Sequence, residues 1–429
     1  MDKRRTQQNG FSGALFRATV MVAAACLFSA PALSPAVGLS GDSSTYLQSR
    51  QLADETRVLG GYEYLDFMVQ NLGSETISFH TGGWLRYDFE GKEYGKRPNE
   101  DLQYSFLSFK SKRDNMIVNL GRVVVFEGVA AERVDGMYAR TDLKGGFGIS
   151  LFGGQPVETN DNFPGNNVIY GARLSQQREG VYQIGVSALQ EEKNSTDYRK
   201  EAAVDLWVHP IAKVDITGRS SWNDITHDFM EHAYVLMLGP FARLRLDTSF
   251  SQISYDDYFF RTTTPVFLIA PGIIEPHEKV RILGETVSVS VTDKVLITAD
   301  YRNFDYTIAG KADYYGGVVK FSAPDSGGAG LAYHRMKGET KVLQYNEYRL
   351  YGYKKFGKIN ITADVLDVAY DTPVNNVKDS YSASLAAQYN LTDALRLGAD
   401  VEYSHNPDFE RDVRGLIKVL YHFGPKGGA

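Results

Sequence analysis

Apolar and polar residues alternate with a period of two over most of the chain, from Glu75 onward. In the first such segment, the apolar Ile77 and Phe79 alternate with the polar Ser78 and His80. Successive side chains of a β-strand point to opposite faces of a sheet, so this period is typical of strands with one apolar face. The alternation therefore predicts an all-β fold.

The alternating segments number about 20, and the uncertainty of their boundaries allows an even number between about 18 and 22. The connections between them are unequal in length. Short turns lie at residues 178–180, 291–293 and 356–357, and longer polar loops cover residues 91–100, 155–165, 255–278 and 371–378. Short turns on one rim and long loops on the other are typical of a membrane barrel.

The length of the segments separates a membrane barrel from a soluble sheet. They run to about 10 to 13 residues, whereas soluble strands have a mode of about 5 to 6 and a tilted membrane crossing needs about 9 to 11. Aromatic residues recur near segment ends, as at Tyr389, Tyr421 and Phe423, where barrels carry interfacial girdles. Because lipid requires every backbone polar group to be paired, such a sheet has to close on itself.

We therefore predict an all-β chain that forms a large transmembrane antiparallel β-barrel of about 20 strands. A soluble exported β-protein is the minor alternative. No apolar run beyond the N-terminal region reaches the roughly 18 residues that a membrane-spanning helix needs, which excludes a bundle of membrane helices.

The first residues of the chain have the pattern of an export signal. Lys3, Arg4 and Arg5 precede an apolar stretch over residues 18–28, and small residues follow up to Ala32. This order predicts a signal peptide that is cleaved after Ala32. In an alternative interpretation, Ala23, Ala24 and Ala25 together with Cys26 form a lipoprotein cleavage box, and Cys26 is lipidated.

Cys26 is the only cysteine of the chain. Cleavage at Ala32 leaves a mature chain without cysteine, which excludes disulfide bonds, thiolate metal sites and covalent haem attachment. We predict four parts: the signal peptide over residues 1–32, an N-terminal periplasmic extension over 33–74, the barrel over 75–423 and a C-terminal tail over 424–429.

Many charged residues fall on the face of the strands that is opposite to the apolar one. A barrel of this size leaves an aqueous channel, so these side chains are predicted to line a lumen and to select among solutes. Alternatively, they pair across neighbouring strands and merely solvate the wall. The predicted lumen charges are Arg86, Asp88, Arg173, Arg219, Arg243, Arg245, Asp247, Asp300, Arg302, Arg396, Asp400, Glu402, Arg414 and Lys418.

The alternation is interrupted over residues 121–138, where an apolar run is followed by a cluster of charges. In porins an inward-folded loop narrows the lumen and presents opposed charges. By that analogy we predict a pore constriction formed by Arg122, Glu127, Glu132 and Arg133. An ordinary strand and extracellular turn is the alternative.

Motifs for catalysis and metal binding are weak. The segment from His227 to His232 has the wrong spacing for a zinc-peptidase motif and is predicted to lie in a strand connection. We predict no catalytic residue, no metal site and no cofactor, and hence no enzyme. The net charge of −6 lacks the basic footprint of a nucleic-acid-binding protein.

Over residues 75–423 the chain resembles the porin-like outer-membrane proteins of Gram-negative bacteria. Its terminal strand, which ends at the aromatic Phe423, resembles the signal that the barrel-assembly machinery recognises, although residues 424–429 follow it. Residues 120–140 and the stretch from Gly38 to Ser44 are similar to proteins of metal-respiring bacteria, in which a porin-like barrel sheathes multihaem cytochromes.

The resemblance implies an outer-membrane location and contacts with outer-membrane lipid and with the assembly machinery. Two functions remain open. The first is a channel for small hydrophilic solutes or ions, with a homotrimer as the expected assembly. The second is a barrel sheath that holds a periplasmic or extracellular multihaem cytochrome for transmembrane electron transfer, the haem belonging to the partner.

Overall fold

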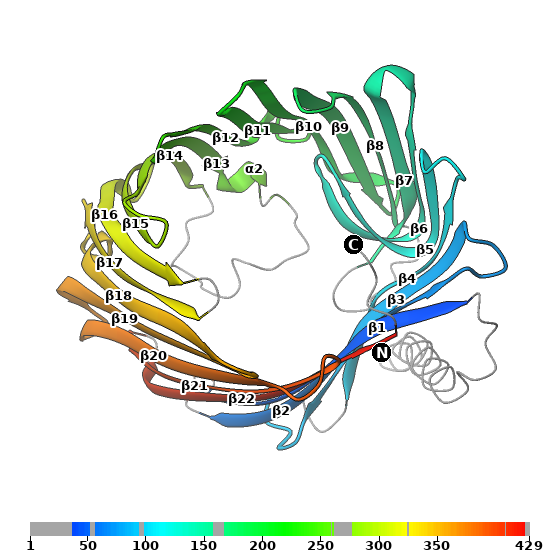
Figure 1. Ribbon diagram of the computed structural model, residues 1–429. Coiled ribbons are helices and arrows are strands. Elements are labelled where there is room, and N and C mark those ends of the chain that lie inside the picture. Colours follow the sequence, from blue (N-terminus) through cyan, green and yellow to red (C-terminus); the bar gives the residue numbers. More distant parts are fainter. Residues whose placement is uncertain are drawn as a thin grey trace.

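The computed structural model describes residues 37–51, 56–93, 98–157, 167–258, 260, 277–323, 326–407 and 409–424. The predicted signal peptide lies outside these residues. The described chain forms one antiparallel sheet of 22 strands, which confirms the predicted fold class and falls within the predicted range of strand numbers (Figure 1).

The strands follow one another around the barrel in sequence order, each paired with its predecessor and its successor. They are β1 (Gly38–Gln51), β2 (Arg57–Gln70), β3 (Ile77–Asp88), β4 (Asn99–Lys110), β5 (Met116–Glu127), β6 (Ala130–Asp142), β7 (Phe147–Pro156), β8 (Asn167–Arg178), β9 (Tyr182–Lys193), β10 (Thr196–Ile211), β11 (Val214–Asn223), β12 (Asp228–Phe241), β13 (Leu244–Ser254), β14 (Lys279–Ser290), β15 (Val295–Tyr306), β16 (Gly310–Ala323), β17 (Gly327–Gly338), β18 (Gln344–Phe356), β19 (Ile359–Val374), β20 (Val377–Asn390), β21 (Leu395–Asn406) and β22 (Phe409–Phe423).

Helical structure is limited to short connections in the described part of the chain: α2 (Tyr255–Tyr258), η2 (Lys144–Gly146) and η4 (Lys341–Leu343). None of the described helices has the length and apolar character that would let it cross a bilayer.

The barrel closes through β1, which pairs with both β2 and β22. The β1–β22 ladder runs from Gly41 opposite Phe423 to Ser49 opposite Gly415. The predicted periplasmic extension over residues 33–74 is therefore wrong for β1 and β2, which are wall strands. Apolar–polar alternation did not predict β1 because this strand has no continuous apolar face. Its Ser43, Thr45 and Ser49 lie on the outer side of the wall, the side on which β22 carries Val419 and Tyr421.

The two rims of the barrel differ, as the sequence predicts. Connections on the rim where β1 begins and β22 ends are short, and the longest of them covers residues 71–76. We call this the turn rim. The opposite rim, the loop rim, carries the long connections after β3, β7 and β13. The long loop predicted over residues 371–378 is wrong, because β19 and β20 continue through it to a turn at Asn375 and Asn376, both of which have positive φ.

The outer face of the wall is apolar. Leu283, Leu331 and Ile417 leave 51%, 60% and 56% of their surface exposed. Apolar side chains exposed to this extent are suited to contact with lipid rather than with water. Outward tyrosines form two bands, with Tyr389 near the turn rim and Tyr403 near the loop rim. The alternate residues of each strand point into the lumen.

Candidate functional site

The hairpin formed by β5 and β6 leaves the barrel wall. The ladder between β4 and β5 stops at Ser105 opposite Arg122, and the ladder between β6 and β7 begins at Val134 opposite Pro156. Between these points β5 and β6 form a ladder with each other, up to Glu127 opposite Ala130, and within the described residues the one backbone bond to the neighbouring wall runs from the N–H of Val157 to the carbonyl oxygen of Arg133. Residues 123–133 thus form a two-stranded extension of the wall, which we call the lumenal hairpin.

Gly121 marks the point where β5 turns away. Its φ of +133° is a conformation that side chains with a Cβ rarely adopt. A Cβ at this position would also lie 2.3 Å from the carbonyl oxygen of Ser105. Only glycine allows the strand to bend here while it stays against β4.

The lumenal hairpin folds inward onto the inner face of β7, β8 and β9 (Figure 1). Val123, Val125 and Val134 are at most 1% exposed. They pack on the lumen-facing residues Phe152, Ile169 and Leu189. The outward neighbours Leu151, Tyr170 and Val186 stay exposed to lipid, so the apolar cluster lies inside the barrel.

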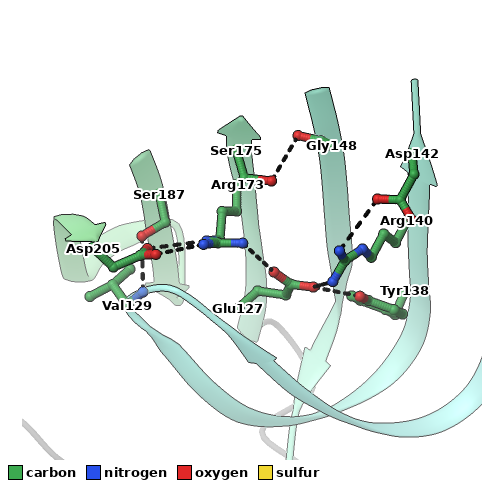
Figure 2. Close-up of polar contacts among 10 residues, drawn as sticks. All are labelled: Glu127, Val129, Tyr138, Arg140, Asp142, Gly148, Arg173, Ser175, Ser187 and Asp205. Atoms are coloured by element: carbon green, nitrogen blue, oxygen red, sulfur yellow. Dashed lines mark hydrogen bonds and ion pairs between the residues drawn. The ribbon is translucent and has the colours of Figure 1, made fainter. Parts of the chain in front are cut away.

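A polar tether fixes the tip of the hairpin to β8 and β9 (Figure 2). Glu127 accepts a hydrogen bond of 2.6 Å from the hydroxyl of Tyr138 and lies 3.7 Å from the guanidinium of Arg173. Arg173 is held on its other side by Asp205 at 2.5 Å. The backbone N–H of Val129 donates to Ser187 Oγ at 2.9 Å.

A second tether lies along the β6 side of the hairpin. Glu132 pairs with Arg199 of β10 at 2.8 Å. Arg199 also lies 3.0 Å from Glu201 and 3.6 Å from Glu191, so three carboxylates surround one buried guanidinium. Burial of this cluster is compensated by the ion pairs and hydrogen bonds within it.

The base of the hairpin is tied to β4. Arg122 binds Asp135 through two hydrogen bonds of 2.7 and 2.9 Å and donates a third, of 2.9 Å, to the carbonyl oxygen of Leu102. Arg133 pairs with Asp101 at 2.5 Å. These side-chain bonds compensate in part for the backbone hydrogen bonds to β5 that β4 lacks on the loop-rim side of Ser105.

The structure brings together all four residues of the predicted constriction, since Arg122, Glu127, Glu132 and Arg133 all belong to the hairpin or to its base. Their charges are not opposed across open water, as they would be in the predicted constriction. Each is paired with a residue of the wall or of the hairpin instead. The surface that the hairpin turns to the lumen carries exposed apolar side chains. Val124 and Phe126 are 38% and 77% exposed.

The partners of these four residues were not anticipated from the sequence. Arg199 and Glu201 are inward residues of β10, and the alternation of inward and outward positions along the strand could have identified them. However, a register shift between Asp197 and Arg199 interrupts the alternation just before them. Asp101 and Asp135 become partners only because the hairpin bends.

The other predicted lumen charges are distributed around the wall, mostly in pairs. Arg86, Arg302, Arg396 and Glu402 lie on the lumen side of their strands, whereas Arg243 lies in the turn between β12 and β13 and donates to the carbonyl oxygen of Val291, so its predicted place on a strand is wrong. These pairs are Arg219 with Glu231, Arg245 with Asp247, His334 with Asp300, Arg414 with Asp412 and Lys418 with Asp400.

Asp88 has a structural role at the loop rim. Its carboxylate accepts backbone hydrogen bonds from Glu90, Gly91 and Glu93 at 2.8 to 3.0 Å and is 2% exposed. It therefore shapes the beginning of the β3–β4 loop and contributes little charge to the lumen.

The histidines over residues 227–232 do not gather into a site. His227 alone lies in the connection before β12, and His232 lies on β12, so the predicted placement of the segment between strands holds only for its first residue. Across the described ranges, no group of three or more histidine, cysteine or acidic residues is arranged to hold a metal ion.

No known family model matches the chain, and no curated protein matches it in sequence. Solved structures of Pseudomonas aeruginosa proteins have a similar fold. A variant of the ferric enterobactin receptor matches with a TM-score of 0.58 and 10% identity over 90% of this chain and 80% of that chain. A second variant, bound to enterobactin, gives 0.55 and 11% over 90% and 81%. The siderophore receptor PirA gives 0.53 and 12% over 91% and 81%.

The chain has the fold of a bacterial outer-membrane barrel. At these identities the similarity concerns the fold and leaves the ligand open. The closed barrel, its apolar outer face and its polar lumen agree with the predicted porin-like class and with a location in the bacterial outer membrane.

Proposed function

We propose that this barrel is a passive channel through which small hydrophilic solutes or ions cross the outer membrane. The observation that carries the proposal is the lumenal hairpin, which is folded against the inner wall and fixed there by ion pairs at its tip, side and base. Barrels of about 16 to 18 strands already leave an aqueous channel, so a wider one needs an internal element to narrow it.

Charge supports the same proposal. Around the rest of the lumen, paired and half-exposed charges such as Lys418 with Asp400 face the interior. Side chains of this kind keep a lumen hydrated and bias the passage of charged solutes. Under this proposal the four predicted constriction residues act through the hairpin, whose position they fix.

The test is the ion current through the purified protein in a planar bilayer. In the test variant, residues 123–133 are replaced by an Asn-Gly turn that joins Arg122 to Val134. We expect the wild type to conduct and the variant to conduct more, because the hairpin no longer occupies part of the lumen. A control that replaces Glu90 and Lys92, an exposed ion pair in the β3–β4 connection at the loop rim, by alanine should conduct like the wild type.

The two parts of the proposal fail separately. A wild-type protein that inserts into the bilayer and carries no current overturns the channel. A current that is unchanged after removal of the hairpin overturns the constriction.

A second candidate is the sheath for a multihaem cytochrome, and one observation favours it. Phe126 is 77% exposed on the side of the hairpin that looks into the lumen, and Val124 beside it is 38% exposed. A purely aqueous pore gains nothing from these apolar side chains, whereas a protein partner inserted in the lumen would cover them. Outer-membrane transporters with about 22 strands carry a plug in the lumen, so a barrel of this width is suited to an occupant.

Any haem in such a complex belongs to the partner, because Cys26 is the only cysteine of this chain. Gentle solubilisation followed by measurement of haem absorbance in the purified complex tests this candidate. We expect Phe126→Asp to release the partner in the sheath, whereas in the channel it should leave the assembly, proposed to be a homotrimer, intact.

A further inference from the structure

A second lumenal feature lies on β15 to β18, across the barrel from the hairpin (Figure 1). The strand register places four inward positions in one row, namely Asp300, Gly316, His334 and Glu347. Arg302, Tyr314 and Tyr345 lie in the next row toward the loop rim. All of these residues except Gly316 line a cavity of about 520 Å³ in the lumen wall.

His334 lies flat in this wall because its neighbour is glycine. A Cβ on Gly316 would lie 2.5 Å from Cδ2 of the imidazole. The imidazole occupies the space that a side chain at residue 316 would fill. It stacks on Tyr314 with a centroid separation of 4.8 Å and an interplanar angle of 10°. Its Nε2 lies 2.9 Å from a carboxylate oxygen of Asp300. His334 is only 7% exposed.

The hydrogen bond to Asp300 determines what the other ring nitrogen offers. A carboxylate accepts, so Nε2 carries the hydrogen and Nδ1 of the neutral imidazole is an acceptor. This nitrogen is buried and has no hydrogen-bond partner in the part of the chain that the structure describes. It lies 3.9 Å from Oε1 of Glu347, a second acceptor, so beside the neutral ring a hydrogen-bond donor placed here would meet both acceptors.

The surroundings indicate what kind of donor fits. Glu347 supplies a negative charge, and the rings of Tyr314 and Tyr345 line the same cavity. Carboxylates and aromatic rings both attract a cation. An ammonium group satisfies the donor requirement and the charge at once.

The other pole of the cavity is positive. Arg302 is exposed, and its guanidinium makes no hydrogen bond or ion pair with a residue that the structure describes. Arg349, in contrast, is already bound by Asp364 at 2.5 Å. Arg302 is therefore the guanidinium available to a carboxylate of a solute.

We propose that this cavity is a selectivity site for small zwitterions that carry an ammonium and a carboxylate group, as α-amino acids do. The ammonium binds at Glu347 and His334 between the tyrosine rings, and the carboxylate binds Arg302. This inference rests on the proposed channel and names the class of solute that the channel favours.

The test compares the entry of two isomeric solutes, the zwitterion L-alanine and the uncharged lactamide, into liposomes that contain the protein. Because the solutes have the same composition and nearly the same size, the ratio of their rates reports on charge recognition. We expect the wild type to favour alanine. Arg302→Gln and Glu347→Gln should each lower the ratio by about tenfold or more, the effect of one hydrogen bond to a charged group, without changing lactamide entry.

Matched controls are Arg396→Gln and Glu402→Gln, lumen-facing charges on β21 outside the cavity, which should keep the wild-type ratio. A wild type that admits neither solute overturns the proposed channel. A wild type that admits both at equal rates, or variants of the cavity that keep the wild-type ratio, overturns the selectivity site and leaves the channel standing.

Discussion

The guanidinium of Arg173 lies 3.7 Å from the carboxylate of Glu127, and both side chains are less than a tenth exposed. One residue belongs to the barrel wall and the other to the tip of the lumenal hairpin, so this ion pair fixes the tip against the wall. Asp205 holds Arg173 from the opposite side. The position of the hairpin therefore depends on a charge that lies on β8.

Arg173→Gln should loosen the tip of the hairpin. The substitution leaves Glu127 buried with only Tyr138 and Arg140 as partners. Removal of one member of a buried ion pair costs about 3 kcal/mol of unfolding free energy or more. We expect greater noise in the open-channel current and a lower stability to urea in bilayers. Arg396→Gln removes a lumenal arginine on the other side of the barrel and should change neither the noise nor the stability.

Gly128→Ala should destabilise the hairpin turn by more than the strain of its positive φ alone. Gly128 has a φ of +59°, and a Cβ would lie 2.2 Å from Ser187 Oγ. Gly180, in the turn between β8 and β9, has a φ of +69° and nothing within 4 Å of its Cβ position.

Alanine at either glycine costs about 1 kcal/mol through the positive φ. Only Gly128→Ala also breaks the contact with Ser187, so we expect it to reduce the unfolding free energy further than Gly180→Ala does. Equal losses for the two variants would show that the contact with Ser187 does not hold the turn.

Phe423→Ala should weaken the closure of the barrel. Phe423 is 7% exposed and packs on Phe67 over Gly41, where β22 meets β1. Loss of a buried aromatic ring costs up to about 3 kcal/mol here, because lipid refills part of the gap. Urea unfolding in bilayers measures the loss.

The matched control for this seam is Tyr421→Ala, whose ring is 45% exposed to lipid and should contribute less. The yield of assembled barrel is recorded separately, since Phe423 is also the terminal aromatic residue that is predicted to guide assembly. A larger loss of stability from Tyr421→Ala would contradict the packing argument.

Lys418→Gln should make the lumen more selective for cations. It removes the partner of Asp400, 2.8 Å away, and leaves an additional net negative charge on the lumen wall. Because this pair is partly hydrated, stability should change by less than about 1 kcal/mol. The reversal potential in a KCl gradient measures the shift, and Lys358→Gln, in a turn outside the lumen, provides the control.

Much of the wall could be predicted from the sequence because alternation is a local property. In β20 to β22 the outward Leu, Val and Tyr residues, except Val419 before Leu420, are followed by an inward small or polar residue. The strands, their faces and the lumenal places of Asp400 and Lys418 therefore follow from the alternation. The same rule failed for β1, whose outward face is mostly Ser and Thr, and the seam with β22 was missed with it.

What the sequence by itself determined is a membrane barrel of about 20 strands with a charged interior, because strand length, alternation and aromatic placement are properties of short segments. It also singled out the residues of the hairpin, since the alternation breaks there. Only the tertiary structure decided that the hairpin turns inward and that Glu127 and Glu132 bind Arg173 and Arg199. The reason is physical: these partners lie on strands that meet the hairpin only after the sheet has curved into a ring, and no local pattern records such a contact.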